Sequence, residues 1–181
     1  MRKWLRRLLS TLENPAGTAS LRGQCWRVTG EALEHPAFFR NLPLLLPADA
    51  VLVLEGGRHP KELEGFLNEH QLTPALKLAA GTFWPRGRTY HVPATAAFLE
   101  ELADRTEHCA ELEVCEHLHA YRDGVVLLQW YDAFSDPAYV SKLVSQDRVE
   151  RFCAVLGVAY AEDDCGGEGE QPSRSPEDGA R

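Results

Sequence analysis

The sequence lacks the short motifs that mark most redox, zinc and nucleotide-binding proteins. Its five cysteines are odd in number, and no two of them are spaced as CxxC. Zinc ribbons and dithiol redox enzymes are therefore not indicated, and free thiols in a reducing cytosol are the simplest expectation. There is also no GxGxxG turn, no GxxxxGKS or GxxxxGKT loop and no GxSxG nucleophile elbow. No common catalytic motif therefore assigns a function.

Long apolar runs are missing as well. No segment approaches the roughly 20 apolar residues that a transmembrane helix needs. The basic start, Arg2 to Arg7, is interrupted by polar residues between Ser10 and Asn14 before any apolar run forms. This order does not fit a secretory signal peptide. We therefore expect a cytoplasmic protein without a transmembrane segment.

Positive charge is scarce outside the first 28 residues. The chain carries a net charge of -8, and residues 1–28 hold six basic residues against one acidic residue. Phosphate binding depends on clustered Lys and Arg, so the rest of the chain gives no strong nucleic-acid signal. A mainly acidic surface of this kind suits a protein partner better.

The composition is otherwise typical of a soluble globular protein, with 44% hydrophobic and 25% charged residues. We predict a basic amphipathic helix in residues 1–14, a single domain in residues 15–161 and a disordered acidic tail in residues 162–181. The tail is rich in Gly, Pro, Ser and acid, with little to bury. The helix places apolar side chains from Trp4 to Leu12 on one face. That face could contact a membrane surface, but we favour packing on the domain.

Strands and helices alternate along the predicted domain. Apolar runs predict strands at 50–55 and 76–83, and helical periodicity predicts a helix after Pro60 and others at 96–107 and 146–156. A short helical turn is expected at 36–42, and segment 21–33 has the alternation of a strand. This order predicts an α/β fold, with α+β as the alternative, in which helices pack on a mixed β-sheet.

A β-hairpin over residues 112–132, followed by a helix, is the clearest structural signal. Asp123-Gly124 suits a two-residue turn, because both positions tolerate a positive φ. Counting outward from this turn pairs His119 with Leu128 and His117 with Trp130. The histidines then form a polar row on one face of the first strand.

This row is the main candidate for a metal or catalytic site. His117 and His119 lie two residues apart on one strand face, and Asp132 lies diagonally across the hairpin. Two imidazoles and a carboxylate would suit Zn²⁺ with an open position for a water nucleophile. His117 could also act as a base oriented by Asp132 without a metal. Glu113, Cys115 and His108 are further ligand candidates.

Packing is the competing interpretation of the same row, and we favour it. In the predicted register His117 faces Trp130 and His119 faces Leu128, and cross-strand pairs of this kind stabilise sheets. A histidine on a sheet face is often a structural residue.

A second candidate site lies in a turn with two arginines. Arginine forks bind carboxylates and phosphates bidentately, and aromatic residues flank the two cations. Such arginines serve equally well for solubility in an acidic domain. The candidate ligand-binding residues are Trp84, Arg86, Arg88, Tyr90 and His91.

Two functions remain open at this point. The first is a non-catalytic binding or regulatory module that engages another macromolecule and needs no cofactor. The second is a small metal-assisted hydrolase using His117, His119 and Asp132, with zinc as its cofactor. We favour the binding module, because the sequence does not supply a complete catalytic set.

Overall fold

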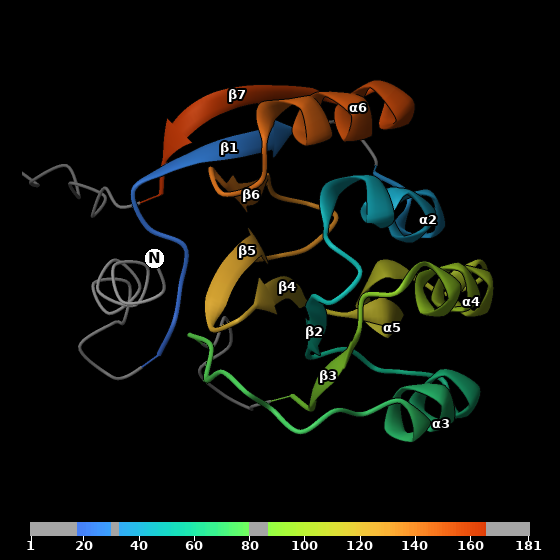
Figure 1. Ribbon diagram of the computed structural model, residues 1–181. Coiled ribbons are helices and arrows are strands. Elements are labelled where there is room, and N and C mark those ends of the chain that lie inside the picture. The colour runs from blue at the N-terminus through green and yellow to red at the C-terminus, as the bar shows by residue number, and fades with distance from the viewer. Residues whose placement is uncertain (1–17, 30–32, 80–86, 166–181) are drawn as a thin grey trace, which may run out of the picture.

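The computed structural model describes residues 18–29, 33–79 and 87–165. Within these ranges, seven strands and five helices follow one another along the chain (Figure 1). The elements are β1 (Gln24–Thr29), α2 (His35–Leu45), β2 (Val51–Glu55), α3 (Lys61–Glu69), β3 (Thr89–Pro93), α4 (Ala96–Thr106), α5 (Glu111–Val114), β4 (His117–Arg122), β5 (Val125–Trp130), β6 (Ala138–Ser141), α6 (Gln146–Leu156) and β7 (Ala159–Asp164). The predicted fold class, helices packed on a β-sheet, is confirmed.

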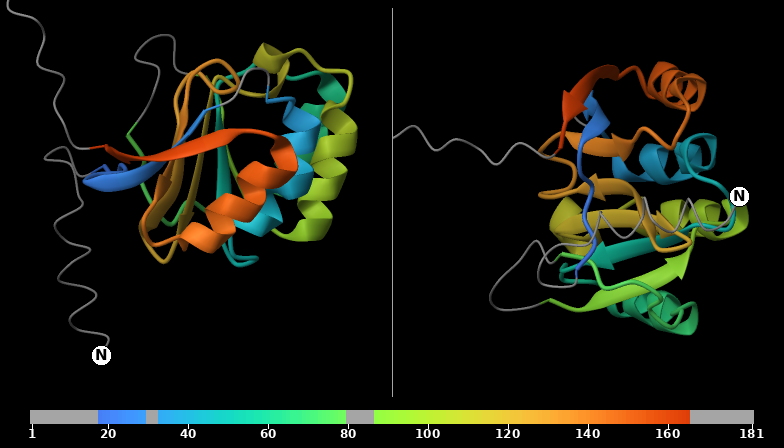
Figure 2. Two further views of the ribbon diagram at one scale, coloured as in Figure 1. Left: turned by 90° about the horizontal axis from the view of Figure 1, so that it is seen from above. Right: turned by 60° about the vertical axis from the view of Figure 1, so that its left-hand side comes forward.

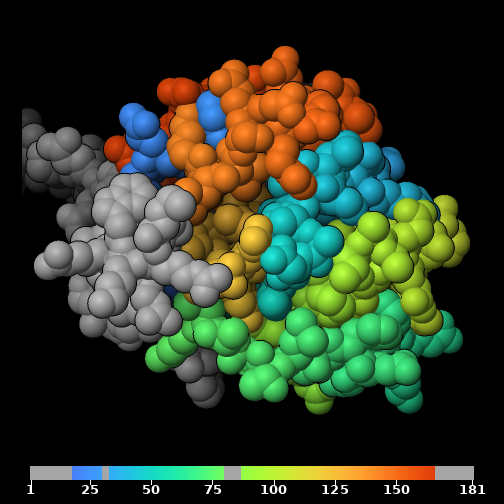
Figure 3. Space-filling model, in the orientation of Figure 1, coloured from blue at the N-terminus to red at the C-terminus, as the bar shows by residue number. Residues whose placement is uncertain are grey.

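The seven strands form one sheet in the order β3-β2-β4-β5-β6-β1-β7. Every pair of neighbouring named strands is antiparallel. The sequence predicted a mixed sheet, and that detail is wrong. Helices α2, α4 and α6 lie side by side on one face of it (Figure 2). The space-filling view shows β1, β6, β7 and α6 gathered at one end of the molecule and α3 at the other (Figure 3). The two edge strands of the sheet, β3 and β7, are separated by five other strands.

The main core lies between the sheet and the helices. Side chains that point to this side alternate along each strand, for example Leu118 and Ala120 in β4 and Leu128 and Trp130 in β5. The Trp130 ring lies 4.9 Å from that of Phe38 in α2 and 4.8 Å from that of Phe134. We call this side of the sheet the helix face. Its burial of large aromatic groups supplies much of the hydrophobic stabilisation.

Helix α2 is longer than the predicted turn at 36–42. It continues past Pro43, which cannot donate a backbone hydrogen bond. At the end of the helix, the guanidinium of Arg148 in α6 donates to the carbonyl oxygens of Pro43, Leu45 and Leu46, which lack helical donors. A cation at a helix C-terminus also interacts favourably with the helix dipole. This tertiary contact was not readable from the local sequence.

The helices predicted at 96–107 and 146–156 are confirmed, and their ends follow ordinary helix-end chemistry. Thr95 caps α4 by accepting from the Phe98 backbone N–H, and Gly157 ends α6 with a φ of 68°. The predicted strand at 76–83 is wrong in its described part, where only Leu78 makes an isolated bridge, to Ala19. The edge strand in this part of the chain is instead β3.

The hairpin is present, but its register differs from the prediction. Asp123 and Gly124 both have positive φ, as the predicted turn requires, and Tyr121 pairs with Val126 as expected. An extra residue, Leu127, then forms a β-bulge, and beyond it His119 pairs with Gln129. The predicted pairs of His119 with Leu128 and of His117 with Trp130 are therefore wrong.

The strand before the turn is also shorter than predicted. Residues 111–114 form the short helix α5, so Glu113 does not belong to the histidine row. Cys115 is buried in the main core. Strand β6 separates the hairpin from α6, where a direct connection was expected.

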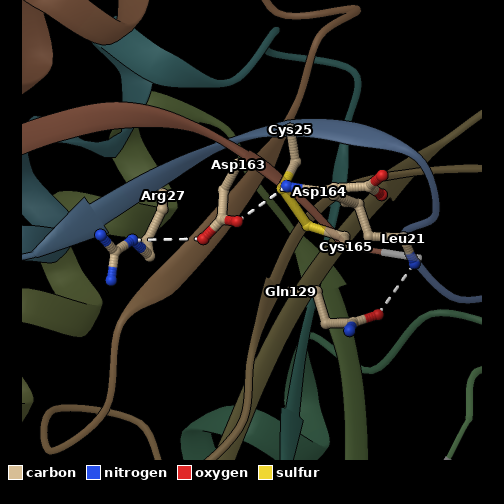
Figure 4. The surroundings of a disulfide bond; sticks show 7 residues. All are labelled: Leu21, Cys25, Arg27, Gln129, Asp163, Asp164 and Cys165. Carbon is tan, nitrogen blue, oxygen red and sulfur yellow. Dashed lines mark hydrogen bonds and ion pairs between the residues drawn. A yellow bond between two sulfur atoms is a disulfide. The ribbon is translucent and has the colours of Figure 1, made fainter. Parts of the chain in front are cut away.

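A disulfide joins Cys25 of β1 to Cys165 after β7, which corrects the expectation of free thiols for these two residues (Figure 4). Cys25 is fully buried in a small second cluster with Ala19, Leu21 and Val126. The domain thus continues through β7 to Cys165, past the boundary predicted at residue 161. Cys109, Cys115 and Cys153 are free.

Two predicted regions lie wholly or largely outside the described residues. The N-terminal helix of residues 1–14 is one, and the acidic tail beyond Cys165 is the other. In the described part of the chain, the helices are all too short or too polar to cross a bilayer.

The disulfide should contribute strongly to stability, because it joins residues 140 positions apart. Replacing Cys25 and Cys165 by alanine should lower the free energy of unfolding by about 4 kcal/mol, since the unfolded chain regains the entropy of the open loop. Urea titration measures this, and reduced wild-type protein should unfold at nearly the same urea concentration as the double variant. Cys109→Ala is the matched control, and it should change little. Equal stability of oxidised and reduced protein would contradict the prediction.

Candidate functional site

Polar side chains gather on the sheet face opposite the helices, which we call the histidine face. In the register of β2 and β4, Val53 pairs with His119 and Glu55 with His117. The ring of Tyr131, just after β5, lies 5.5 Å from that of His117 and 5.2 Å from that of His119. Both histidines and Glu55 are buried. Two imidazoles, a carboxylate and a phenol therefore meet in a space sheltered from water.

The bulge at Leu127 brings Tyr131 to this face. A shift of one residue moves every later side chain to the opposite side of a strand. Trp130 therefore joins Leu118 on the helix face, and Gln129 joins His119 on the histidine face. The packing partners that we expected for the histidines are in fact on the other side of the sheet.

His117 is held in one tautomer by the backbone of Asp132. The Asp132 N–H donates to His117 Nδ1 at 3.0 Å. A neutral ring that accepts at Nδ1 carries its proton on Nε2. Its Nε2 is then a donor, neither a base nor a metal ligand. Asp132 adopts a positive φ of 45°, which aspartate tolerates better than most residues.

This arrangement does not favour the prediction that His117 acts as a general base oriented by the Asp132 carboxylate. An orienting carboxylate normally accepts from Nδ1–H, whereas here Asp132 Oδ1 lies 4.0 Å from Nδ1 and the backbone N–H occupies that nitrogen. Metal binding by His117, His119 and Asp132 also stays a prediction. Among the described residues no group of three His, Cys, Asp or Glu side chains is arranged to hold a metal ion.

His119 is the least satisfied polar group of the cluster. It is 1% exposed, and its Nε2 has no hydrogen-bond partner. Glu55 Oε2 lies 3.8 Å away, which is too far for a hydrogen bond. An unsatisfied buried group of this kind costs about 1–3 kcal/mol.

Burial favours the neutral forms of two groups in this cluster. Burial lowers the pKa of His119, and the nearby Glu55 carboxylate partly opposes this. Burial also raises the pKa of Tyr131, and Glu55 adds to that effect. His119 is therefore held neutral by its surroundings, which suits a structural role in a sheet as well as a chemical one.

A second polar contact lies beside the cluster. His91 Nδ1 lies 3.1 Å from the Tyr121 hydroxyl, which also accepts from the Ala75 backbone N–H. Burial lowers the pKa of His91. These bonds tie segment 71–79 to the histidine face.

The predicted arginine site is not brought together in the described residues. Tyr90 and His91 are adjacent in β3, so Tyr90 points to the helix face and His91 to the histidine face. Arg88 forms an ion pair with Glu64 of α3. Trp84 and Arg86 lie outside the described residues.

The free thiols are not activated. Burial raises the pKa of Cys115, and Glu116 adds to the effect. Burial also raises the pKa of Cys153, to about 11. A reactive cysteine needs a lowered pKa, because the thiolate is the nucleophile. Neither residue therefore has the surroundings of a catalytic nucleophile.

The two edges of the sheet differ in a way that bears on binding. At the β3 edge, the His91 N–H donates to the Gln71 side chain and the His91 carbonyl accepts from the Leu72 N–H. Segment 71–72 therefore covers that edge. At the β7 edge, no described strand or loop pairs with the outer side of the strand. An uncovered strand edge is a ready template for another chain.

Sequence reasoning missed Glu55 and Tyr131 as members of the cluster, and it missed the β7 edge. Glu55 ends an otherwise apolar strand, and an acid at that position was the available signal. Counting outward from the turn without a bulge would put Tyr131 on the helix face, and the bulge has no distinct sequence signal.

The burial of His119 makes a testable prediction about pH. Its folded-state pKa lies below the ordinary value of 6.5, so the stability linked to the neutral ring is complete above that value and is lost as the pH falls toward the folded-state pKa. His119→Phe should therefore reduce the difference in unfolding free energy between about pH 7.5 and about pH 5. His108→Phe, at an exposed histidine, is the control and should keep the wild-type difference. An unchanged pH dependence in His119→Phe would contradict the prediction.

No family model, curated protein or solved structure matches this chain. A functional conclusion therefore depends on the geometry of the described residues.

Proposed function

We propose that the protein is a non-catalytic binding module that engages another macromolecule by accepting one of its extended segments at the outer edge of β7. The observation that carries this proposal is the contrast between the sheet's two edges. At the β3 edge, segment 71–72 pairs with His91, whereas no described strand pairs with the outer side of β7 at Tyr160 and Glu162. Strand addition at such an edge is a common mode of peptide recognition.

The hydrogen-bonding pattern identifies the groups that a partner would use. The Cys165 N–H donates to the Gly23 carbonyl of the preceding loop. Because donors alternate along an antiparallel strand, the odd-numbered residues of β7 bond to β1. The N–H and carbonyl groups of Tyr160 and Glu162 therefore point outward. Each of the two residues can therefore form a pair of backbone hydrogen bonds with the residue opposite it on an antiparallel partner.

The edge is held rigidly, which favours binding. The Cys25–Cys165 disulfide fastens the end of β7 to β1. The Tyr160 ring packs edge-on against that of Trp26 in β1 at 5.8 Å, and Lys142 lies over the tryptophan ring, 3.0 Å from its centre. A strand that is already ordered loses little entropy when a partner binds.

The alternative function, a metal-assisted hydrolase at His117, His119 and Asp132, has less support. It needs His117 Nε2 or Nδ1 as a lone-pair donor, and the hydrogen bond from Asp132 works against both. We therefore propose no zinc or other cofactor for the binding function.

A cytoplasmic location stays a proposal that follows from composition alone. The disulfide weighs against it, since such bonds are rare in reducing compartments. Full burial of Cys25 would slow its reduction. Membrane contact through Trp4 to Leu12 remains the lesser proposal, because those residues lie outside the described part of the chain.

Proline substitutions test strand addition directly. Glu162→Pro removes an outward N–H, so it should abolish binding of an added strand while the melting temperature changes little. Ala161→Pro is the matched control, because it removes an inward N–H and should lower the melting temperature. The probes are two six-residue peptides, Lys-Lys-Lys-Val-Thr-Val and Thr-Thr-Thr-Val-Thr-Val.

Nuclear magnetic resonance titration of labelled protein provides the measurement. At least one peptide should shift the amide signals of Tyr160 and Glu162 in wild-type protein, and Glu162→Pro should weaken its binding by about tenfold or more. If neither peptide shifts these signals, the strand-addition proposal is wrong.

A further inference from the structure

We infer that the β7 edge selects a basic segment that binds antiparallel to β7, with its basic residues first and apolar residues after them. This inference rests on the binding function proposed above and adds the chemistry and direction of the partner. It comes from the uneven distribution of side chains along β7, where Ala159, Tyr160 and Ala161 precede Glu162, Asp163 and Asp164.

The three acids place negative charge on both faces of the edge. In the β1 register Trp26 pairs with Glu162 and Cys25 with Asp163. Glu162 therefore shares the helix face with Trp26, and Asp163 lies on the histidine face. A partner strand alternates its side chains in the same way. Consecutive basic residues on that strand would meet a carboxylate on whichever face they point to.

Glu162 and Asp163 have partners within the chain, but their carboxylates stay partly exposed. Glu162 bonds to Lys142 at 2.7 Å. Asp163 bonds to Arg27 at 3.2 Å and also accepts from the Asp164 N–H at 2.8 Å, as Figure 4 shows. The Glu162 side chain nevertheless remains 70% exposed and that of Asp163 38% exposed. A carboxylate accepts several hydrogen bonds, so each can bind a partner cation without losing its present one.

The first half of the strand suits a different kind of residue. Ala159 and Ala161 are small and leave room on the histidine face for larger partner side chains. Tyr160 presents a half-buried ring on the helix face, next to Trp26. Apolar cross-strand neighbours are favoured beside an aromatic ring. This half of the edge therefore matches apolar residues.

The direction of the partner follows from the rest of the sheet. Every neighbouring pair of named strands is antiparallel, and the antiparallel ladder is slightly more stable per residue. An antiparallel partner begins opposite Asp164 and ends opposite Ala159. Its basic residues must therefore come first in its own sequence.

A second copy of this chain is the less suitable occupant. Each copy carries a net charge of -8, and like charges repel across a shared edge. A basic segment instead gains from the same charge.

The test compares three peptides by fluorescence anisotropy against the full, oxidised protein. Lys-Lys-Lys-Val-Thr-Val has the inferred order, Val-Thr-Val-Lys-Lys-Lys reverses it with the same composition and charge, and Thr-Thr-Thr-Val-Thr-Val removes the charge. We expect the first peptide to bind at least about tenfold more tightly than either of the others.

Variants of the protein identify the residues responsible. The triple variant Glu162→Gln/Asp163→Asn/Asp164→Asn keeps the backbone edge and should lose the preference for the first peptide. Glu62→Gln/Glu69→Gln/Glu107→Gln removes three exposed acids elsewhere and should keep it. Melting temperatures show that both triple variants are folded.

Each other outcome overturns a defined part of the inference. Equal binding of the uncharged peptide would leave strand addition standing and refute the basic partner. Equal binding of the reversed peptide would refute the antiparallel order. Binding by none of the peptides would refute the proposed function as well. Concentration-dependent dimers that Glu162→Pro abolishes would assign the edge to a second copy of the chain.

Discussion

One extra residue in β5 decides which side chains share each face of the sheet. Leu127 forms a bulge opposite the junction of Ala120 and Tyr121. Beyond it, Trp130 points to the helices, where it packs with Phe38 and Phe134. The main core therefore depends on this bulge. Without the inserted residue, the largest aromatic side chain of β5 would lie beside the histidines, and the aromatic cluster under α2 would lose its centre.

The same bulge gives the histidine face its character. It places Tyr131 against His117 and His119, and burial favours the neutral forms of His119 and Tyr131. The Asp132 N–H donates to His117 Nδ1, so the lone pair of that nitrogen is already engaged. A constellation that resembles a metal site in sequence is thus better explained as a buried polar network of the sheet. Its unsatisfied member, His119, costs stability that the aromatic core offsets.

The features that support binding lie at the end of the sheet, away from this cluster. Strand β7 is fastened by a disulfide and by the contact of Tyr160 with Trp26, and its outer side is not covered by any described residue. An exposed edge invites aggregation unless charges oppose it. In the proposed function, the acids of β7 oppose pairing with other acidic chains and, by the same electrostatics, favour a basic partner. Protection and selectivity therefore come from the same residues.

Local sequence determined the elements whose signals are short-range. The Asp123-Gly124 turn follows from positive φ, the Thr95 cap and Gly157 stop from helix-end chemistry, and α6 from its apolar spacing. Only the tertiary structure decided the bulge at Leu127, the pairing of Cys25 with Cys165 and the joining of Glu55 to the histidine row. Each of these depends on contacts between distant segments, which cysteine spacing and strand periodicity do not encode. Counting outward from a correct turn therefore gave a wrong histidine environment, because one inserted residue reverses the face of every residue after it.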